Sequence, residues 1–141
     1  MSYAARIALR HRPDDGQVQV LLGTLLGRGR LVADPDGVRL VVVMDERHAW
    51  LADWTYQRIA PLALPPQRVR GRVLLRSATH ALFADLAEML ERPARLLAVV
   101  GRDGLWVWAM YARVSGCERS RAPCVCAPAT PLRLRTLRRA S

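Results

Sequence analysis

The chemistry that the sequence offers most plainly is cationic, in a segment that runs from residue 67 to residue 76. This segment reads Gln-Arg-Val-Arg-Gly-Arg-Val-Leu-Leu-Arg. Because side chains alternate between the two faces of a strand, a single strand here would place Arg68, Arg70, Arg72 and Arg76 on one face. The apolar residues and Gly71 would lie on the inward face, with Gly71 allowing a close packing contact. A row of guanidinium groups suggests an acidic partner.

Further arginines extend this cationic set. Arg28 and Arg30 follow Gly23 and Gly27 in a glycine-rich stretch, which is either a phosphate cradle or a flexible connection. The flexible connection is favoured, because no helix is predicted to follow and supply its dipole. Near the C-terminus the chain is again rich in arginine. We predict that the nucleic-acid-contacting residues are Arg28, Arg30, Arg68, Arg70, Arg72, Arg76, Arg133, Arg135, Arg138 and Arg139.

The densest group of titratable residues is Asp45, Glu46 and His48. Neighbouring residues of a helix point in different directions, and Asp45 suits the N-cap position, so a solvated helix start is favoured over a catalytic site. The chain also lacks lysine, which excludes P-loop and Schiff-base chemistry. No nucleophile elbow or zinc-protease motif is present. The sequence therefore predicts no enzymatic activity, no cofactor and no small-molecule substrate.

Three cysteines, Cys117, Cys124 and Cys126, lie close together near the C-terminus. With His11, His48 or His80 as a fourth ligand they could bind zinc, but their spacing lacks the C-x2-C pair that is typical of zinc sites, so free cysteines are favoured. A disulfide of Cys117 with Cys124 or Cys126 is a further alternative, which a reducing compartment disfavours. Trp106 and Trp108 would share one face of a strand, where they could stack on bases or pack against helices. Packing is the favoured interpretation.

The net charge is +10 and the isoelectric point is near 11.2. All 22 basic residues other than histidine are arginine, and asparagine is also absent. Both absences follow A/T-rich codons and indicate a GC-rich gene, bacterial or from a phage of such a host. Codon bias does not explain the excess of basic over acidic residues, which favours an anionic partner such as nucleic acid or an acidic subunit.

The hydrophobic pattern predicts the elements that position these residues. We expect strands at 3–11 and 17–24, and a hairpin of 30–33 with 38–44 whose second strand is buried on both faces. A helix is expected at 45–60, the arginine strand at 67–76, a helix that Ser77 caps and that ends before Pro93, and a second hairpin of 94–101 with 105–114.

These elements predict a single α+β domain over residues 1–114, followed by a basic tail with proline and cysteine at 115–141. The domain would hold a small mixed or antiparallel sheet, with two hairpins plus additional strands and two helices on one face. No signal peptide or transmembrane segment is recognised, so we expect a protein of the cytoplasm or of a particle assembled inside the cell.

The function favoured by the sequence is a non-catalytic subunit of a nucleoprotein complex that contacts the phosphate backbone of DNA or RNA through arginine. The alternative is a structural assembly protein, such as a small virion component or an adaptor, whose basic tail docks on neighbouring subunits. A small hydrolase or metal enzyme ranks last.

Overall fold

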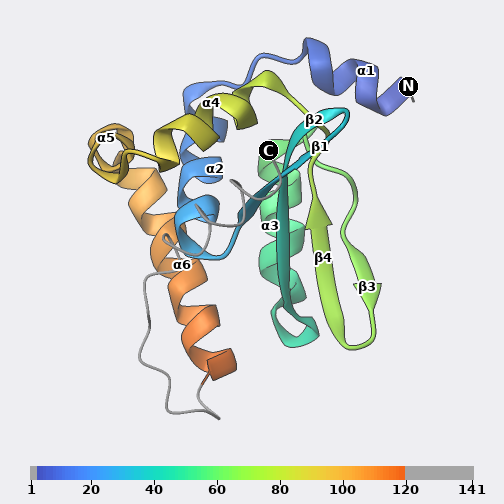
Figure 1. Cartoon of the computed structure of the whole chain (residues 1–141). Coiled ribbons are helices and arrows are strands. Elements are labelled where there is room, and N and C mark those ends of the chain that lie inside the picture. The colour runs from blue at the N-terminus through green and yellow to red at the C-terminus, as the bar shows by residue number, and fades with distance from the viewer. Residues whose placement is uncertain (1–2, 120–141) are drawn as a thin grey trace.

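A four-stranded antiparallel sheet, in the order β1-β2-β4-β3, forms one side of the molecule, and helices pack against one of its faces (Figure 1). A computed structural model of the chain describes residues 3–119. Its elements are α1 (Tyr3–Arg10), α2 (Asp15–Gly27), β1 (Arg30–Asp34), β2 (Gly37–Asp45), the short 3-10 helix η1 (Glu46–His48), α3 (Ala49–Ile59), β3 (Gln67–Val69), β4 (Arg72–Arg76), α4 (Ala81–Leu90), α5 (Pro93–Val99) and α6 (Arg102–Arg119).

The α+β class and the antiparallel sheet are confirmed, whereas the expectation of two helices is wrong because the described residues form six α-helices. Two hairpins, β1-β2 and β3-β4, build the whole sheet, with β2 and β4 paired in its centre. None of the described helices is both long enough and apolar enough to cross a bilayer.

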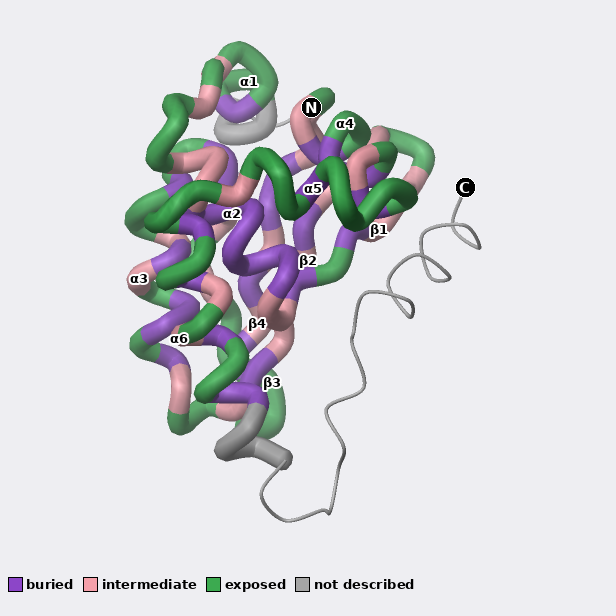
Figure 2. The backbone as a smooth tube through the Cα atoms, turned by 90° about the vertical axis from the view of Figure 1, so that its left-hand side faces the viewer, coloured by how far each residue is buried: buried purple, intermediate pink, exposed green. Residues whose placement is uncertain are grey.

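The first hairpin and its inner strand are where the sequence predicted them. β1 pairs with β2 through the turn at Asp34–Gly37, and β2 has a neighbour on each side. Along β2, Leu40, Val42 and Met44 are buried, while the residues between them are half-buried (Figure 2). The expectation of burial on both faces is therefore wrong, because the core lies against only one face of the sheet.

The two strands predicted at 3–11 and 17–24 are instead the helices α1 and α2. The Asp14 carboxylate accepts a hydrogen bond from the backbone N–H of Gln17 at 2.8 Å, and the Gln17 side chain accepts one from the N–H of Asp14 at 3.2 Å. This capping box starts a helix at a point that resembles a turn in the sequence. The run from Val20 to Leu26 is buried throughout, which hides the helical period.

The second predicted hairpin is also wrong, because residues 93–119 form α5 and α6. Pro93 occupies the first turn of α5, where its missing N–H costs nothing. Gly104, which resembled a turn residue, lies inside α6 and against α2. In a helix Trp106 and Trp108 point in different directions: Trp106 is 57% exposed, whereas Trp108 packs against the core.

The helix over residues 81–90 is confirmed, and Phe83, Leu86 and Leu90 form its buried stripe. Its cap is different from the predicted one. His80 Nδ1 accepts from the N–H of Leu82 at 3.0 Å, while Ser77 accepts from the N–H of Leu40 at 2.8 Å and donates to the carbonyl of Ala78. Ser77 therefore ties the end of β4 to β2.

The helices α2 and α6 cross in close contact. A Cβ atom added at Gly23 would lie 2.5 Å from the carbonyl oxygen of Gly104 and 2.6 Å from the Cβ of Val107. One added at Gly27 would lie 2.3 Å from the Cβ of Tyr111. These distances are far below van der Waals contact, so the two helices can approach only because glycine occupies both positions.

The Tyr111 hydroxyl is buried within the helical layer. The whole residue is buried, and its oxygen is 2.6 Å from the Thr55 hydroxyl of α3. Burial raises the pKa of Tyr111 to about 12, because the phenolate would be desolvated there. One phenol thus links α6 to α3 beside the glycine contact with α2.

Replacing Gly23 or Gly27 by alanine is expected to lower the free energy of unfolding by about 1–3 kcal/mol, because overpacking outweighs the gain of about 1 kcal/mol in helix propensity. Urea unfolding followed by far-UV circular dichroism measures this change. Ala109→Gly, at an exposed site of α6, calibrates the propensity effect alone. A rise in stability for either glycine variant would contradict the close crossing.

Tyr111→Phe is expected to lower the free energy of unfolding by about 1–2 kcal/mol, because the buried Thr55 hydroxyl loses its partner. Urea unfolding of the variant at neutral pH measures this change.

The stability of the protein is also expected to depend on alkaline pH. In the unfolded chain Tyr111 loses its proton near pH 10, but in the folded protein only near pH 12. The unfolded chain is deprotonated first, so wild-type stability falls as the pH rises through that range. Urea titrations at several alkaline pH values should show this fall in wild type and in Tyr56→Phe. A fall of the same size in Tyr111→Phe would contradict the assignment.

Candidate nucleic-acid interface

The arginine segment at 67–76 is a hairpin, so the prediction of a single strand with four arginines on one face is wrong. β3 and β4 are joined by Arg70 and Gly71, whose φ angles are 52° and 77°. Two successive positive φ angles form a tight turn that matches the twist of a hairpin. Gly71 is exposed with nothing within 4 Å of an added Cβ, so its predicted close packing is also wrong.

The sheet register nevertheless brings three predicted arginines to one face. Arg30 of β1 and Arg76 of β4 both pair with Val41, and Arg72 pairs with Asp45 on the same side of β2. Directly paired residues of an antiparallel sheet share a face, and strands lie about 4.8 Å apart. Arg30 and Arg76 therefore begin about 10 Å apart, across the central strand.

We call this surface the outer sheet face, and it lies opposite the core. Its apolar residues Val41, Val43 and Leu74 are half-buried and do not belong to the core cluster, whereas Leu40, Val42 and Leu75 on the other face do. Arg39 on the outer sheet face is paired with Asp34 at 2.8 Å. The outer sheet face thus has an apolar centre with arginines at its borders.

Not every predicted arginine is available on this surface. Arg28 is half-buried, and its Nε donates to the carbonyl of Val43 at 2.9 Å. Val43 lies in the part of β2 that has no partner residue in β1. Arg68 lies on the opposite side of the sheet from Arg72 and donates to Glu46 at 3.1 Å. Arg28 is thus held against β2, and Arg68 points away from the outer sheet face.

The other arginines are better placed. Arg30 and Arg72 are exposed on the outer sheet face, and Arg70 is exposed at the adjacent hairpin tip. Within residues 3–119 these three guanidinium groups form no hydrogen bond or ion pair. Arg76 donates to the neutral amide of Gln67 at 3.3 Å and keeps its full charge uncompensated. Arg133, Arg135, Arg138 and Arg139 lie outside the described residues.

The acidic cluster separates into distinct structural roles. Asp45 caps η1 by accepting from the N–H of Arg47 at 2.9 Å, and this hydrogen bond lowers the pKa of Asp45. Glu46 pairs with Arg68 across to β3. His48 is half-buried, and its Nε2 forms no hydrogen bond within the described chain. The three side chains do not converge on one point.

The predicted cysteine group cannot be placed, because Cys124 and Cys126 and the side chain of Cys117 lie outside the described residues. Among the side chains that the structure does describe, no three His, Cys, Asp or Glu residues are grouped closely enough to hold a metal ion.

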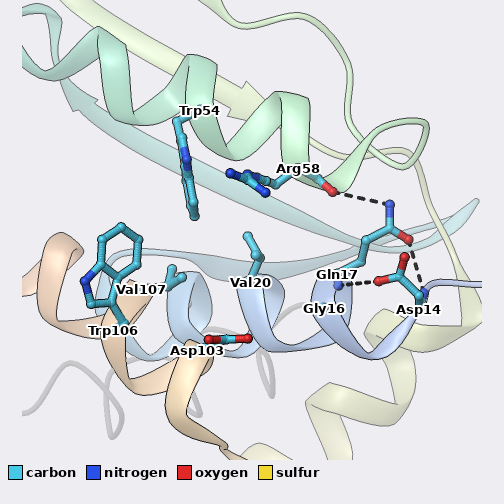
Figure 3. A pocket seen from close by; sticks show the side chains of 9 residues that line it. All are labelled: Asp14, Gly16, Gln17, Val20, Trp54, Arg58, Asp103, Trp106 and Val107. Atoms are coloured by element: carbon cyan, nitrogen blue, oxygen red, sulfur yellow. Dashed lines mark hydrogen bonds between the residues drawn. The ribbon is translucent and has the colours of Figure 1, made fainter.

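A pocket of about 390 Å³ lies between α2, α3 and α6, and the sequence analysis missed it (Figure 3). It was missed because α2 and the start of α6 were predicted as strands. The helical spacing of Asp103, Trp106 and Val107 is the signal that would have placed these side chains on one face. The lining residues are Asp14, Gly16, Gln17, Val20, Trp54, Arg58, Asp103, Trp106 and Val107.

Comparison of the chain with protein-family models, with curated proteins and with solved structures found no match.

The hairpin tip gives a direct test of the β3-β4 turn. Arg70→Asn should stabilise the protein by a few tenths to about 1 kcal/mol, because asparagine tolerates positive φ better than arginine. Gly71→Ala should destabilise it by about 1 kcal/mol, although the added methyl group meets no neighbour. Thermal unfolding should show a higher melting temperature for Arg70→Asn and a lower one for Gly71→Ala. An unchanged melting temperature for Gly71→Ala would contradict the turn geometry.

Proposed function

We propose that this protein is a non-catalytic, nucleic-acid-contacting subunit of a nucleoprotein complex, and that the outer sheet face contacts the phosphate backbone. The observation that carries the proposal is the position of Arg30 and Arg72, which are exposed, form no ion pair within the described residues and lie on one face of the sheet. Arg76 lies level with Arg30 across β2 and on the same strand as Arg72, and Arg70 extends the surface at the hairpin tip.

The charge balance supports this proposal. Residues 3–119 contain 17 arginines and 12 acidic residues, so the described part of the chain has a net charge of +5. Residues 120–141 contain five further arginines and no acidic residue. Such an excess favours association with a polyanion.

The apolar centre of the outer sheet face indicates how the contact is made. Val41, Val43 and Leu74 offer neither hydrogen-bond donors for base edges nor aromatic rings for stacking. The arginines at the borders reach phosphates instead, so binding is expected to be strong at low salt and indifferent to sequence.

The test is the affinity of the full chain for a fluorescent single-stranded oligonucleotide of arbitrary sequence, measured by anisotropy over a salt series. Arg30→Gln/Arg72→Gln should weaken binding and flatten the slope of log K against log[salt] by about 1.4, because each lost phosphate contact contributes about 0.7 on single strands.

The matched control is Arg92→Gln/Arg95→Gln, which removes the same charge from exposed positions beside α4 and α5. This control should change the slope by much less. Equal effects of the two double variants would show that binding follows net charge alone, and no binding by wild type at low salt would overturn the proposal.

A further inference from the structure

The pocket between α2, α3 and α6 has walls of opposite charge. The guanidinium of Arg58 comes from α3 on one side, and the carboxylate of Asp103 comes from the first turn of α6 on the other (Figure 3). Val20 and Val107 are buried and form an apolar floor between them. Trp54 and Trp106 close one end, with ring centroids 5.9 Å apart in an edge-to-face arrangement.

Two of the polar residues at the other end already form hydrogen bonds within the protein. Asp14 caps α2, and the amide of Gln17 donates to the carbonyls of Arg58 and Ala60 at 3.3 and 2.9 Å. Gln17 Oε1 also lies 2.8 Å from Nε2 of His11. These contacts join the start of α2 to the end of α3, so they hold the pocket in shape.

Arg58 and Asp103 differ from Asp14 and Gln17, because their side chains do not form such hydrogen bonds within residues 3–119. Within the described residues they form no ion pair with each other, and neither side chain makes a hydrogen bond. The Arg58 guanidinium lies over the face of Trp54, at 5.3 Å from the ring centroid. Trp106 remains more than half exposed beside Asp103.

We propose that this pocket binds a small zwitterion of the amino-acid class that has an apolar or aromatic side chain. The ligand carboxylate pairs with Arg58, its ammonium group pairs with Asp103, and its side chain lies on the valine floor against Trp106. A pocket of about 390 Å³ is of a size that holds such a ligand. The site lies among the helices, and is independent of the outer sheet face.

The charges of the lining residues disfavour the other classes of ligand. A nucleotide would bring its phosphate close to two carboxylates, those of Asp14 and Asp103, with only Arg58 to balance it. A simple organic cation would meet Arg58, and a neutral ligand would leave both charges without a partner. A zwitterion satisfies both walls, because charge-assisted hydrogen bonds form at each one.

Phenylalanine is a suitable probe, because it is transparent where tryptophan fluorescence is excited. Isothermal titration calorimetry and fluorescence of the full chain should show saturable binding of phenylalanine. The methyl ester lacks the carboxylate and N-acetylphenylalanine lacks the ammonium group, so each is expected to bind about tenfold more weakly.

Variants of the two walls connect each charge to its partner. Arg58→Gln should bind phenylalanine and its methyl ester equally, and Asp103→Asn should bind phenylalanine and the N-acetyl form equally. Both residues are exposed, so these variants are expected to fold. The controls Arg95→Gln and Asp85→Asn, on exposed positions of α5 and α4, should retain the wild-type preferences.

The results that overturn the proposal are distinct from those that concern nucleic acid. No saturable binding of phenylalanine, equal binding of the three probes by wild type, or tighter binding of a mononucleotide would each overturn it. The Arg30→Gln/Arg72→Gln variant should bind phenylalanine as wild type does, since the outer sheet face takes no part in the pocket.

Discussion

The contact on which the rest of the structure depends is the close crossing of α2 and α6. Gly23 and Gly27 allow α2 to approach the backbone of α6 near Gly104 and the ring of Tyr111. With the two helices in contact, the Tyr111 hydroxyl reaches Thr55 of α3, and the helices form one layer. A larger side chain at either glycine would separate α2 from α6 and remove the packing that buries Tyr111.

This helical layer also decides which face of the sheet is free. α3 and α4 pack on the side of Leu40, Val42 and Met44, so hydrophobic burial on the sheet is complete on that face alone. The outer sheet face then keeps a modest apolar centre, with the exposed Arg30 and Arg72 at its borders. Its cationic character follows from the register of three strands, since Arg30 and Arg76 are distant in sequence but pair with the same valine.

The same layer creates the pocket. Asp103 and Trp106 face it because α6 crosses α2 at the glycines, and Arg58 faces it because Gln17 joins the end of α3 to the start of α2. Helix packing thus holds the Arg58 guanidinium and the Asp103 carboxylate on different walls, where they form no ion pair with each other. The outer sheet face and the pocket offer two different chemistries on separate parts of one small domain.

Local patterns determined part of this fold from the sequence. The turn at Asp34–Gly37, the inner strand β2, the helix after Asp45 and the stripe of α4 were predicted, because turn residues, caps and a clear helical period identify them. Only the tertiary structure decided the rest. The apolar runs of α2 and α6 suit a strand as well as a buried helix, and packing of α2 against α6 selects the helix. Likewise, the turn at Arg70 and Gly71 separated the arginines, and strand pairing determined which of them share a face.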